Sequence, residues 1–343
     1  MGPIMTENSK PRKKGKKIVL SIAAVSVVVA VVCALWSRGV FETETRELDH
    51  DSLEARVVTP ELVADLGKKV EDGDARAMAE LAYYHQRGIV AELDKDKAFA
   101  LYSKAAEKGE AFAENALGEM FYKGDGVKTD YSEARKWFEK ASARGSVEAT
   151  RFLALMHERG QGVPLDLEKA AEYTKMAADG GNVFAQYKMG QMYLNGKGVI
   201  KNAGEAARYF RLAADKNSAV AQCGLGIMYY QGDGVTRDLA LAVSLIEKSA
   251  AQNFVFAVYN MGLLYENGDG VPKSSQKAAE YYEKAKNAGF PLAAQKLGAM
   301  YQSGTGVAQN TRLARELFLE SEASSGPANY YRYPSGLVGD AYR

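Results

Sequence analysis

Cysteine and histidine are scarce in this sequence. The 343 residues include two cysteines, Cys33 and Cys223, and three histidines, His50, His85 and His157. Because Cys33 lies in an apolar segment, the two cysteines cannot build a framework of disulfide bonds. His85 and His157 occupy the same position of a sequence repeat, two units apart. Stacked helix pairs advance by ~10 Å, so these two rings lie ~20 Å apart and cannot share a metal ion.

An excess of charge of either sign is also missing. The 44 basic and 43 acidic residues leave a formal net charge of +1. Proteins that bind nucleic acid carry a basic patch or stripe, and none stands out here beyond residues 1–17. The composition therefore predicts no nucleic-acid partner.

Long apolar runs are absent with one exception, residues 18–36, which are uncharged and mostly apolar. At 1.5 Å per helical residue this run is ~28 Å long, close to the ~30 Å hydrocarbon core of a bilayer. We therefore predict a transmembrane signal anchor at residues 18–36. A secretory signal peptide cleaved after Val32-Cys33-Ala34 is the alternative, and it would release the rest of the chain.

The charges on the two sides of the apolar run predict its orientation. Residues 1–17 hold Lys10, Arg12, Lys13, Lys14, Lys16 and Lys17 against the single acid Glu7. An acidic stretch between Glu42 and Asp51 follows the run. Because lysine and arginine favour the cytoplasmic side, residues 1–17 are expected in the cytoplasm. In a bacterium the remainder of the chain would then face the periplasm from the inner membrane.

A 36-residue repeat organises most of the chain. It is marked by glycine pairs followed by valine, each shifted by 36 residues from the last: Gly124/Gly126/Val127, Gly160/Gly162/Val163, Gly196/Gly198/Val199, Gly232/Gly234/Val235, Gly268/Gly270/Val271 and Gly304/Gly306/Val307. Alanines keep the same interval from Ala77 to Ala293. Seven units therefore fill residues 74–325. Stacked repeats bury a continuous core that no single unit can form.

Each unit contains the signals of two helices. In the second unit, residues 113–121 carry apolar side chains at helical spacing, and Gly124 ends that helix. Asp130 is the expected cap of a second helix, whose apolar stripe covers residues 134–141 and which ends at Gly145.

The segments outside the repeats differ from one another. Residues 37–59 are predicted to be a linker. Thr59-Pro60 begins a lone capping helix over residues 60–73, because a cap residue followed by proline is a helix-start signal. Residues 326–343 abandon the repeat pattern and are rich in tyrosine, glycine and proline, which predicts a flexible C-terminal tail.

Residues 221–235 follow the pattern A-x-x-x-L-G-x-M-Y-x-x-G-x-G-V, which resembles the Sel-one-like repeat, a relative of the tetratricopeptide repeat. The resemblance implies an all-α fold, a right-handed α/α solenoid whose concave groove binds proteins. It implies no cofactor.

A cysteine-rich branch of the family, at times described as β-lactamases, depends on a disulfide in every repeat. This chain cannot form those disulfides, so we carry over no hydrolase activity. One departure is Ala154, which replaces the helix-packing glycine of the third unit.

The residues that vary between units predict the binding surface. Positions equivalent to 112, 115, 119 and 122 share one face of the first helix, which we call the first-helix face. We predict that its apolar and charged side chains bind the partner, because aromatic anchors rimmed by charge are typical of protein interfaces. These residues are Phe112, Tyr122, Arg151, Leu155, Phe184, Tyr187, Leu194, Ile227, Tyr230, Phe256, Tyr259 and Leu263. Several could instead pack against neighbouring helices.

No catalytic arrangement stands out. The Gly-Asp-Gly-Val turns lack the Lys-Ser/Thr of a phosphate loop and the carboxylates of a calcium loop, so we interpret them as tight connections between helices. We therefore predict a non-catalytic scaffold that binds another protein, with an immunity protein, an inhibitor of a secreted effector and an envelope assembly adaptor as specific forms. The alternative is a cell-envelope enzyme acting on peptidoglycan or a small molecule. That enzyme would need a convergent set of acid, base or nucleophile, which the sequence does not show.

Overall fold

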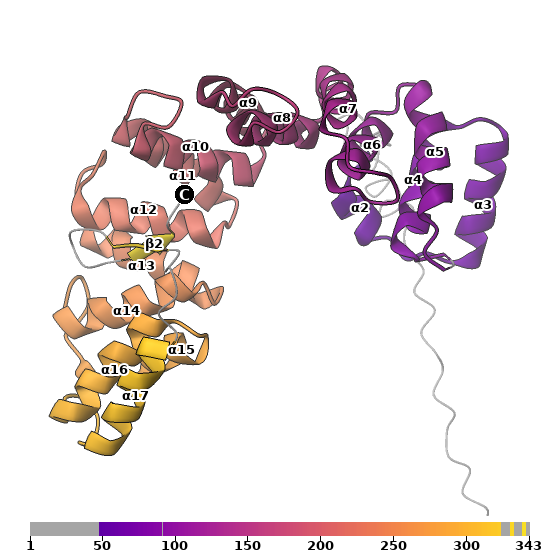
Figure 1. Ribbon diagram of the computed structural model, residues 1–343. Coiled ribbons are helices and arrows are strands. Elements are labelled where there is room, and N and C mark those ends of the chain that lie inside the picture. Colours follow the sequence, from indigo (N-terminus) through magenta and orange to yellow (C-terminus); the bar gives the residue numbers. More distant parts are fainter. Residues whose placement is uncertain (1–47, 91, 324–329, 333–337, 341–343) are drawn as a thin grey trace, which may run out of the picture. The chain divides into compact units, whose positions relative to one another are not determined.

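The computed structural model describes residues 48–90, 92–323, 330–332 and 338–340 (Figure 1). The chain divides into two compact units, residues 1–52 and residues 53–343, and the described part of the first is residues 48–52. The predicted transmembrane segment, residues 18–36, lies outside the described residues, as do residues 1–17. Within the described ranges, no helix combines the length and the apolar character that a membrane span needs.

The described residues contain sixteen α-helices, which confirms the predicted all-helical repeat solenoid. Two of them precede the repeats: α2 (His50–Glu54) and α3 (Pro60–Glu71). Seven pairs follow: α4 (Ala75–Arg87) with α5 (Lys95–Glu107), α6 (Ala111–Lys123) with α7 (Tyr131–Ala143), α8 (Val147–Arg159) with α9 (Leu167–Asp179), α10 (Val183–Asn195) with α11 (Ala203–Asp215), α12 (Ala219–Gln231) with α13 (Leu239–Ala251), α14 (Val255–Asn267) with α15 (Ser275–Asn287), and α16 (Pro291–Ser303) with α17 (Thr311–Ala323).

Glycine ends the first helix of every pair. Gly124 has a φ of 72°, and the backbone N–H groups of Gly124 and Asp125 both donate to the Met120 carbonyl, at 2.9 and 3.0 Å. The turn then closes when the Asp130 N–H donates to the Phe121 carbonyl at 2.9 Å. The Asp130 carboxylate caps α7 by accepting from the backbone N–H groups of Ser132 and Glu133, as the sequence predicts.

The second glycine of the turn, present in units two to seven, has a different role. Gly198 also has a positive φ, 70°, but it lies so close to α9 that a Cβ atom would stand 2.0 Å from the Leu167 carbonyl oxygen. No side chain fits there. The glycine pair therefore fixes both the path of the chain within one unit and its close approach to the preceding unit.

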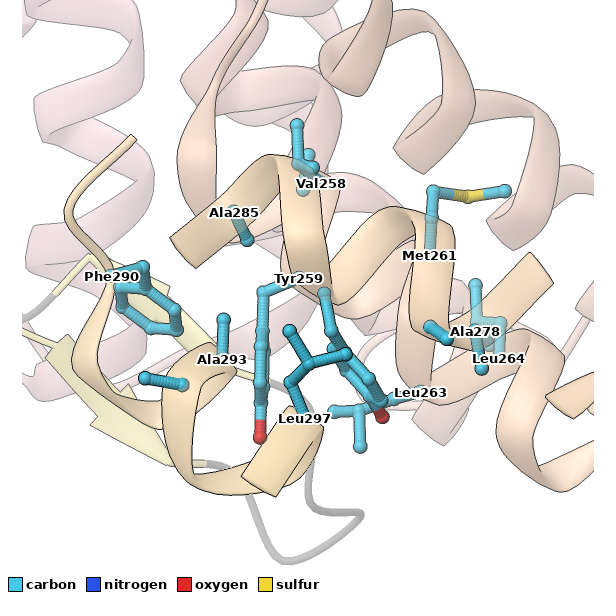
Figure 2. Close-up of a cluster of buried hydrophobic side chains, with 14 of the residues drawn as sticks. Val258, Tyr259, Met261, Leu263, Leu264, Ala278, Ala285, Phe290, Ala293 and Leu297 are labelled. Atoms are coloured by element: carbon cyan, nitrogen blue, oxygen red, sulfur yellow. The ribbon is translucent and has the colours of Figure 1, made fainter. Parts of the chain in front are cut away.

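The core lies within and between the helix pairs. Each first helix packs against the second helix of its own unit and against the second helix of the preceding one. Figure 2 shows one such cluster, in which Tyr259 and Leu263 of α14 lie beside Phe290 and Leu297. Each unit buries its apolar surface only against its neighbours. The stability of the array is therefore approximately the sum of the contributions of single units and of the interfaces between adjacent units.

Helix α3 occupies the stretch for which the sequence predicts a lone capping helix. The Thr59 hydroxyl accepts a hydrogen bond from the Leu62 N–H, and Pro60 is the first helical residue. The short helix α2 lies in the predicted linker, residues 37–59. Arg56, which follows α2, forms an ion pair at 2.5 Å with Glu80, a nearly buried residue of α4.

Two short strands follow the last helix and are not predicted by the repeat pattern. Strands β1 (Tyr330–Arg332) and β2 (Val338–Asp340) pair antiparallel, with Tyr331 opposite Gly339. Strand β2 contacts α12 and α14, the first helices of units five and six. Part of the first-helix surface in these two units is therefore occupied by the chain's own C-terminal segment.

Candidate functional site

The predicted first-helix face divides into buried and accessible residues. Five of the twelve side chains are buried in the stack: Phe112, Tyr187, Ile227, Tyr259 and Leu263. Six are partly buried: Tyr122, Arg151, Leu155, Leu194, Tyr230 and Phe256. Phe184 alone of the twelve is well exposed, at 53% of its surface.

The buried members do not present a surface to a partner, which corrects their assignment as anchors. Tyr259 is 1% exposed, and its ring centroid lies 5.0 Å from that of Phe290 and 5.4 Å from that of Tyr282 (Figure 2). Tyr187 stacks on Phe210 at 5.5 Å and accepts a hydrogen bond from Gln191. Large residues of adjacent helices cover these positions, so they contribute to the core.

The accessible members converge on units three and four. Arg151, Leu155 and Arg159 lie on one side of α8 at intervals of four residues, and Phe184 and Lys188 lie on α10. Together they line one pocket of about 180 Å³ between these helices. We call these five residues the central surface. The variable positions of the repeat predict Arg151, Leu155 and Phe184 at this surface, but they do not include Arg159 and Lys188.

Arg151 is held in place by charge and by aromatic rings. Its Nε atom lies 2.8 Å from an oxygen of Glu148, and its guanidinium carbon lies 4.5 Å from the Phe152 ring centroid and 5.8 Å from that of Phe184. Asn182 donates a second hydrogen bond to Glu148 at 2.6 Å. Cations over aromatic faces are attracted by the ring quadrupole, so the guanidinium is oriented beside the pocket.

Lys188 forms a nearly buried ion pair with Glu158 of the preceding unit. The two side chains are 8% and 13% exposed. Burial lowers the pKa of Lys188, and Glu158 opposes that effect. Lys296 and Glu266 occupy the equivalent positions in units seven and six and lie 2.9 Å apart. The recurrence of the pair, and not either residue alone, is the sequence signal that could have identified it.

The comparisons with known proteins agree with the observed repeat. The Sel1 repeat family matches residues 75–110, 111–146, 147–182, 183–218, 219–254, 255–290 and 291–322, which together make up most of the chain. The chain belongs to the Sel1 repeat family. Sel1 repeat proteins are generally non-catalytic scaffolds, and such scaffolds are typical of protein–protein interaction.

Solved Sel1 repeat structures share this fold. A Sel1 repeat protein from Oxalobacter formigenes is 25% identical, with a TM-score of 0.62, and the match covers 72% of this chain and 98% of that one. The protective antigen c5321 of uropathogenic Escherichia coli is 28% identical, with a TM-score of 0.52. That match covers 79% of this chain and 65% of the antigen, so this chain spans less than two thirds of the antigen's length.

An immunity protein of Pseudomonas aeruginosa, Pa5087, is 24% identical, with a TM-score of 0.37 over 62% of this chain and 82% of that one. No curated protein sequence matches the chain.

The glycine turns of the Sel1 repeats connect successive units through hydrogen bonds. Tyr122 donates to Gln161 at 2.5 Å, and the equivalent Tyr230 donates to Asp269 at 2.7 Å. In both contacts the acceptor is the residue between the two turn glycines of the next unit. This supports the interpretation of the Gly-Asp-Gly-Val motif as a structural connection.

The histidines have packing roles where the structure describes them. His157 stacks on Tyr173 with ring centroids 5.5 Å apart, and the His85 side chain is buried in α4. Among the described residues, no group of three histidine, cysteine, aspartate or glutamate side chains is arranged to hold a metal ion.

Proposed function

We propose that this chain is a non-catalytic scaffold that binds a protein partner through the central surface of units three and four. The exposed ring of Phe184 carries the proposal. In the part of the chain that the structure describes, Phe184 is the one aromatic residue among the large exposed hydrophobic side chains. At the same repeat position Phe112 is buried and Phe256 is partly buried.

An exposed aromatic ring beside arginine has the character of an interface anchor. Full burial of an exposed phenylalanine is worth roughly 1.5–3 kcal/mol, so covering the 53% of Phe184 that is exposed would recover about half of that free energy. Aromatic residues and arginine are enriched where interfaces concentrate their binding energy. The 5.8 Å between the Arg151 guanidinium and the Phe184 ring keeps both types of group in one surface.

Site-specific photo-crosslinking in cells tests this proposal. The full chain would carry benzoylphenylalanine at position 184, and as a control at Met176, which is 56% exposed on the second helix α9. We expect one protein adduct, identified by mass spectrometry, from position 184 and none from position 176. Adducts of equal yield from both positions, or none from 184, would contradict the proposal.

The proposal extends to location. The chain is tethered to the bacterial inner membrane by residues 18–36, with its repeats in the periplasm; the length of the apolar run and the basic residues before it support this arrangement. An alkaline phosphatase fused after residue 343 should be active, because that enzyme folds only when exported. An inactive fusion, with full activity of a cytoplasmic reporter at the same site, would contradict it.

An immunity protein is a specific form of the proposal. A tethered scaffold would stand beside the membrane and could neutralise a toxic secreted effector by covering the surface that the effector uses. An envelope assembly adaptor would bind a resident protein instead. The identity of the adduct from position 184 separates the two, because the first form requires a secreted toxin or lipase.

A further inference from the structure

The third unit departs from units two and four, its neighbours in the stack, in the contact between its two helices. In the second unit Gly118 faces Phe138, and a Cβ atom on Gly118 would lie 2.5 Å from Cε1 of that ring. Unit four repeats this arrangement with Gly190 and Phe210. The residues 36 positions after Gly118 and Phe138 are Ala154 and Thr174. The third unit therefore has a short, branched side chain where its neighbours have a ring.

The replacement leaves a space in the third unit. In units two and four, a phenylalanine ring fills the equivalent space. Ala154 and Thr174 both line the pocket of about 180 Å³ between α8 and α10. Both are nearly inaccessible to solvent, and the Thr174 hydroxyl is already satisfied because it donates to the Ala170 carbonyl at 2.6 Å. The Thr174 hydroxyl therefore has no hydrogen left to donate to a carboxylate in the pocket.

The walls of the pocket are cationic. Arg151 and Arg159 lie on the α8 side and Lys188 on the α10 side, while no aspartate or glutamate of the described residues lines it. Arg151 and Lys188 pair with Glu148 and Glu158, but those two carboxylates lie outside the lining. With two carboxylates set against three cations, this group of side chains keeps a net positive charge.

We infer that this pocket binds an acidic side chain, glutamate or aspartate, presented by the protein partner. This inference rests on the proposed function and specifies the chemistry that the central surface recognises. The methylene groups of the inserted side chain contact Leu155 and the Phe184 ring, and its carboxylate accepts hydrogen bonds from Arg151 and Arg159. Arginine suits this role because its planar guanidinium matches a carboxylate and is weakly hydrated.

A small probe tests the pocket without the partner. The full chain, labelled with ¹³C at its alanine methyl groups, is titrated with N-acetyl-glutamyl-leucinamide, and the Ala185 methyl signal reports binding because Ala185 lines the pocket. We expect a saturable shift with a dissociation constant on the order of 1 mM, typical of a weak fragment. N-acetyl-glutaminyl-leucinamide should bind at least about threefold more weakly, since it lacks the charge.

Two variants give the structural control. Ala154→Gly with Thr174→Phe restores the glycine and ring pair of unit four, so the chain should fold with an unchanged or raised Tm while the Ala185 shift is lost. Arg159→Gln should weaken probe binding at least about threefold, whereas Lys175→Gln, which removes the same charge from the exposed side of α9, should leave it unchanged.

The inference is overturned if the two peptides shift Ala185 equally, or if the pocket-filling double variant still binds. It is also overturned if Arg159→Gln and Lys175→Gln have equal effects. None of these results would affect the adduct expected at position 184, so failure of the pocket and failure of the proposed function remain distinguishable.

Discussion

Cys223 shows how strongly the stack changes the chemistry of one residue. The side chain is 1% exposed, and burial raises the pKa of its thiol to about 12, although the Asn260 amide, 3.7 Å from the sulfur, acts in the opposite direction. Because the thiolate is the reactive form, Cys223 should resist alkylation in the folded chain.

The measurement is iodoacetamide labelling of a Cys33→Ser background at increasing urea concentration. We expect labelling of Cys223 to follow the unfolding transition detected by circular dichroism. If Cys223 were labelled without urea at the rate of a free cysteine, this part of the core would be accessible to the reagent, and the prediction would be wrong.

The lowered pKa values of His85 and His157 predict that folding stability depends on pH. Burial is the largest cause that lowers the pKa of both His85 and His157 below 6.5, and nearby lysines act in the same direction. Among the described residues, neither Nδ1 atom has a hydrogen-bond partner. The unfolded chain therefore binds protons more readily than the folded chain just below pH 6.5. Folding stability is complete above 6.5 and falls as the pH drops through that value towards the lower folded pKa.

The comparison is between the wild type and a His85→Tyr/His157→Tyr variant, because tyrosine occupies this repeat position in units four to seven. Urea unfolding is measured above and below pH 6.5. The free energy of unfolding should fall less at the lower pH in the variant than in the wild type. An equal loss in the two proteins would assign the pH dependence to other groups.

At the scale of the element, glycine has opposite effects at different positions of a helix. A Cβ atom on Gly190 would lie 2.5 Å from Phe210, whereas nothing lies within 4 Å of a Cβ atom on Gly67 in α3. Gly67→Ala should raise stability by ~0.5–1 kcal/mol, because alanine loses less backbone entropy in a helix. Gly190→Ala should lower it by ~1–3 kcal/mol through overpacking.

Thermal unfolding of the two variants beside the wild type measures the difference. We expect Tm changes of opposite sign. If Gly190→Ala stabilised the chain as much as Gly67→Ala does, the close contact between α10 and α11 could not be a determinant of helix packing.

The helix boundaries could be predicted from the sequence, but the burial of particular side chains could not. Gly124 and Asp130 specify their helix ends through local hydrogen bonds, which depend on neighbouring residues alone. Tyr259 lies on the face of α14 that corresponds to the face of Phe184 on α10, yet it is buried because Phe290, from the next unit, covers it. Helical periodicity predicts on which side of its helix a residue lies. It does not predict which residues of other helices cover that residue.

At the scale of the whole molecule, the exact 36-residue period made the solenoid predictable. Each unit repeats the same local signals, so one unit's interpretation transfers to the other six. The C-terminal strands could not be predicted in this way, because residues 330–340 have no counterpart in the repeat. The pocket depends on one exchange, Thr174 for a larger residue, whose effect becomes visible only when α8, α9 and α10 are placed together.

The most direct test of the central claim is the affinity of the purified partner, once identified by crosslinking, for the full chain. Isothermal titration calorimetry would compare the wild type with Phe184→Ala and Met176→Ala, which truncate exposed residues on a first and a second helix. The account predicts that Phe184→Ala weakens binding about 10- to 100-fold, as truncation of an interface anchor does, while Met176→Ala changes it less than about twofold. Equal affinities for all three proteins would show that the partner does not bind the central surface.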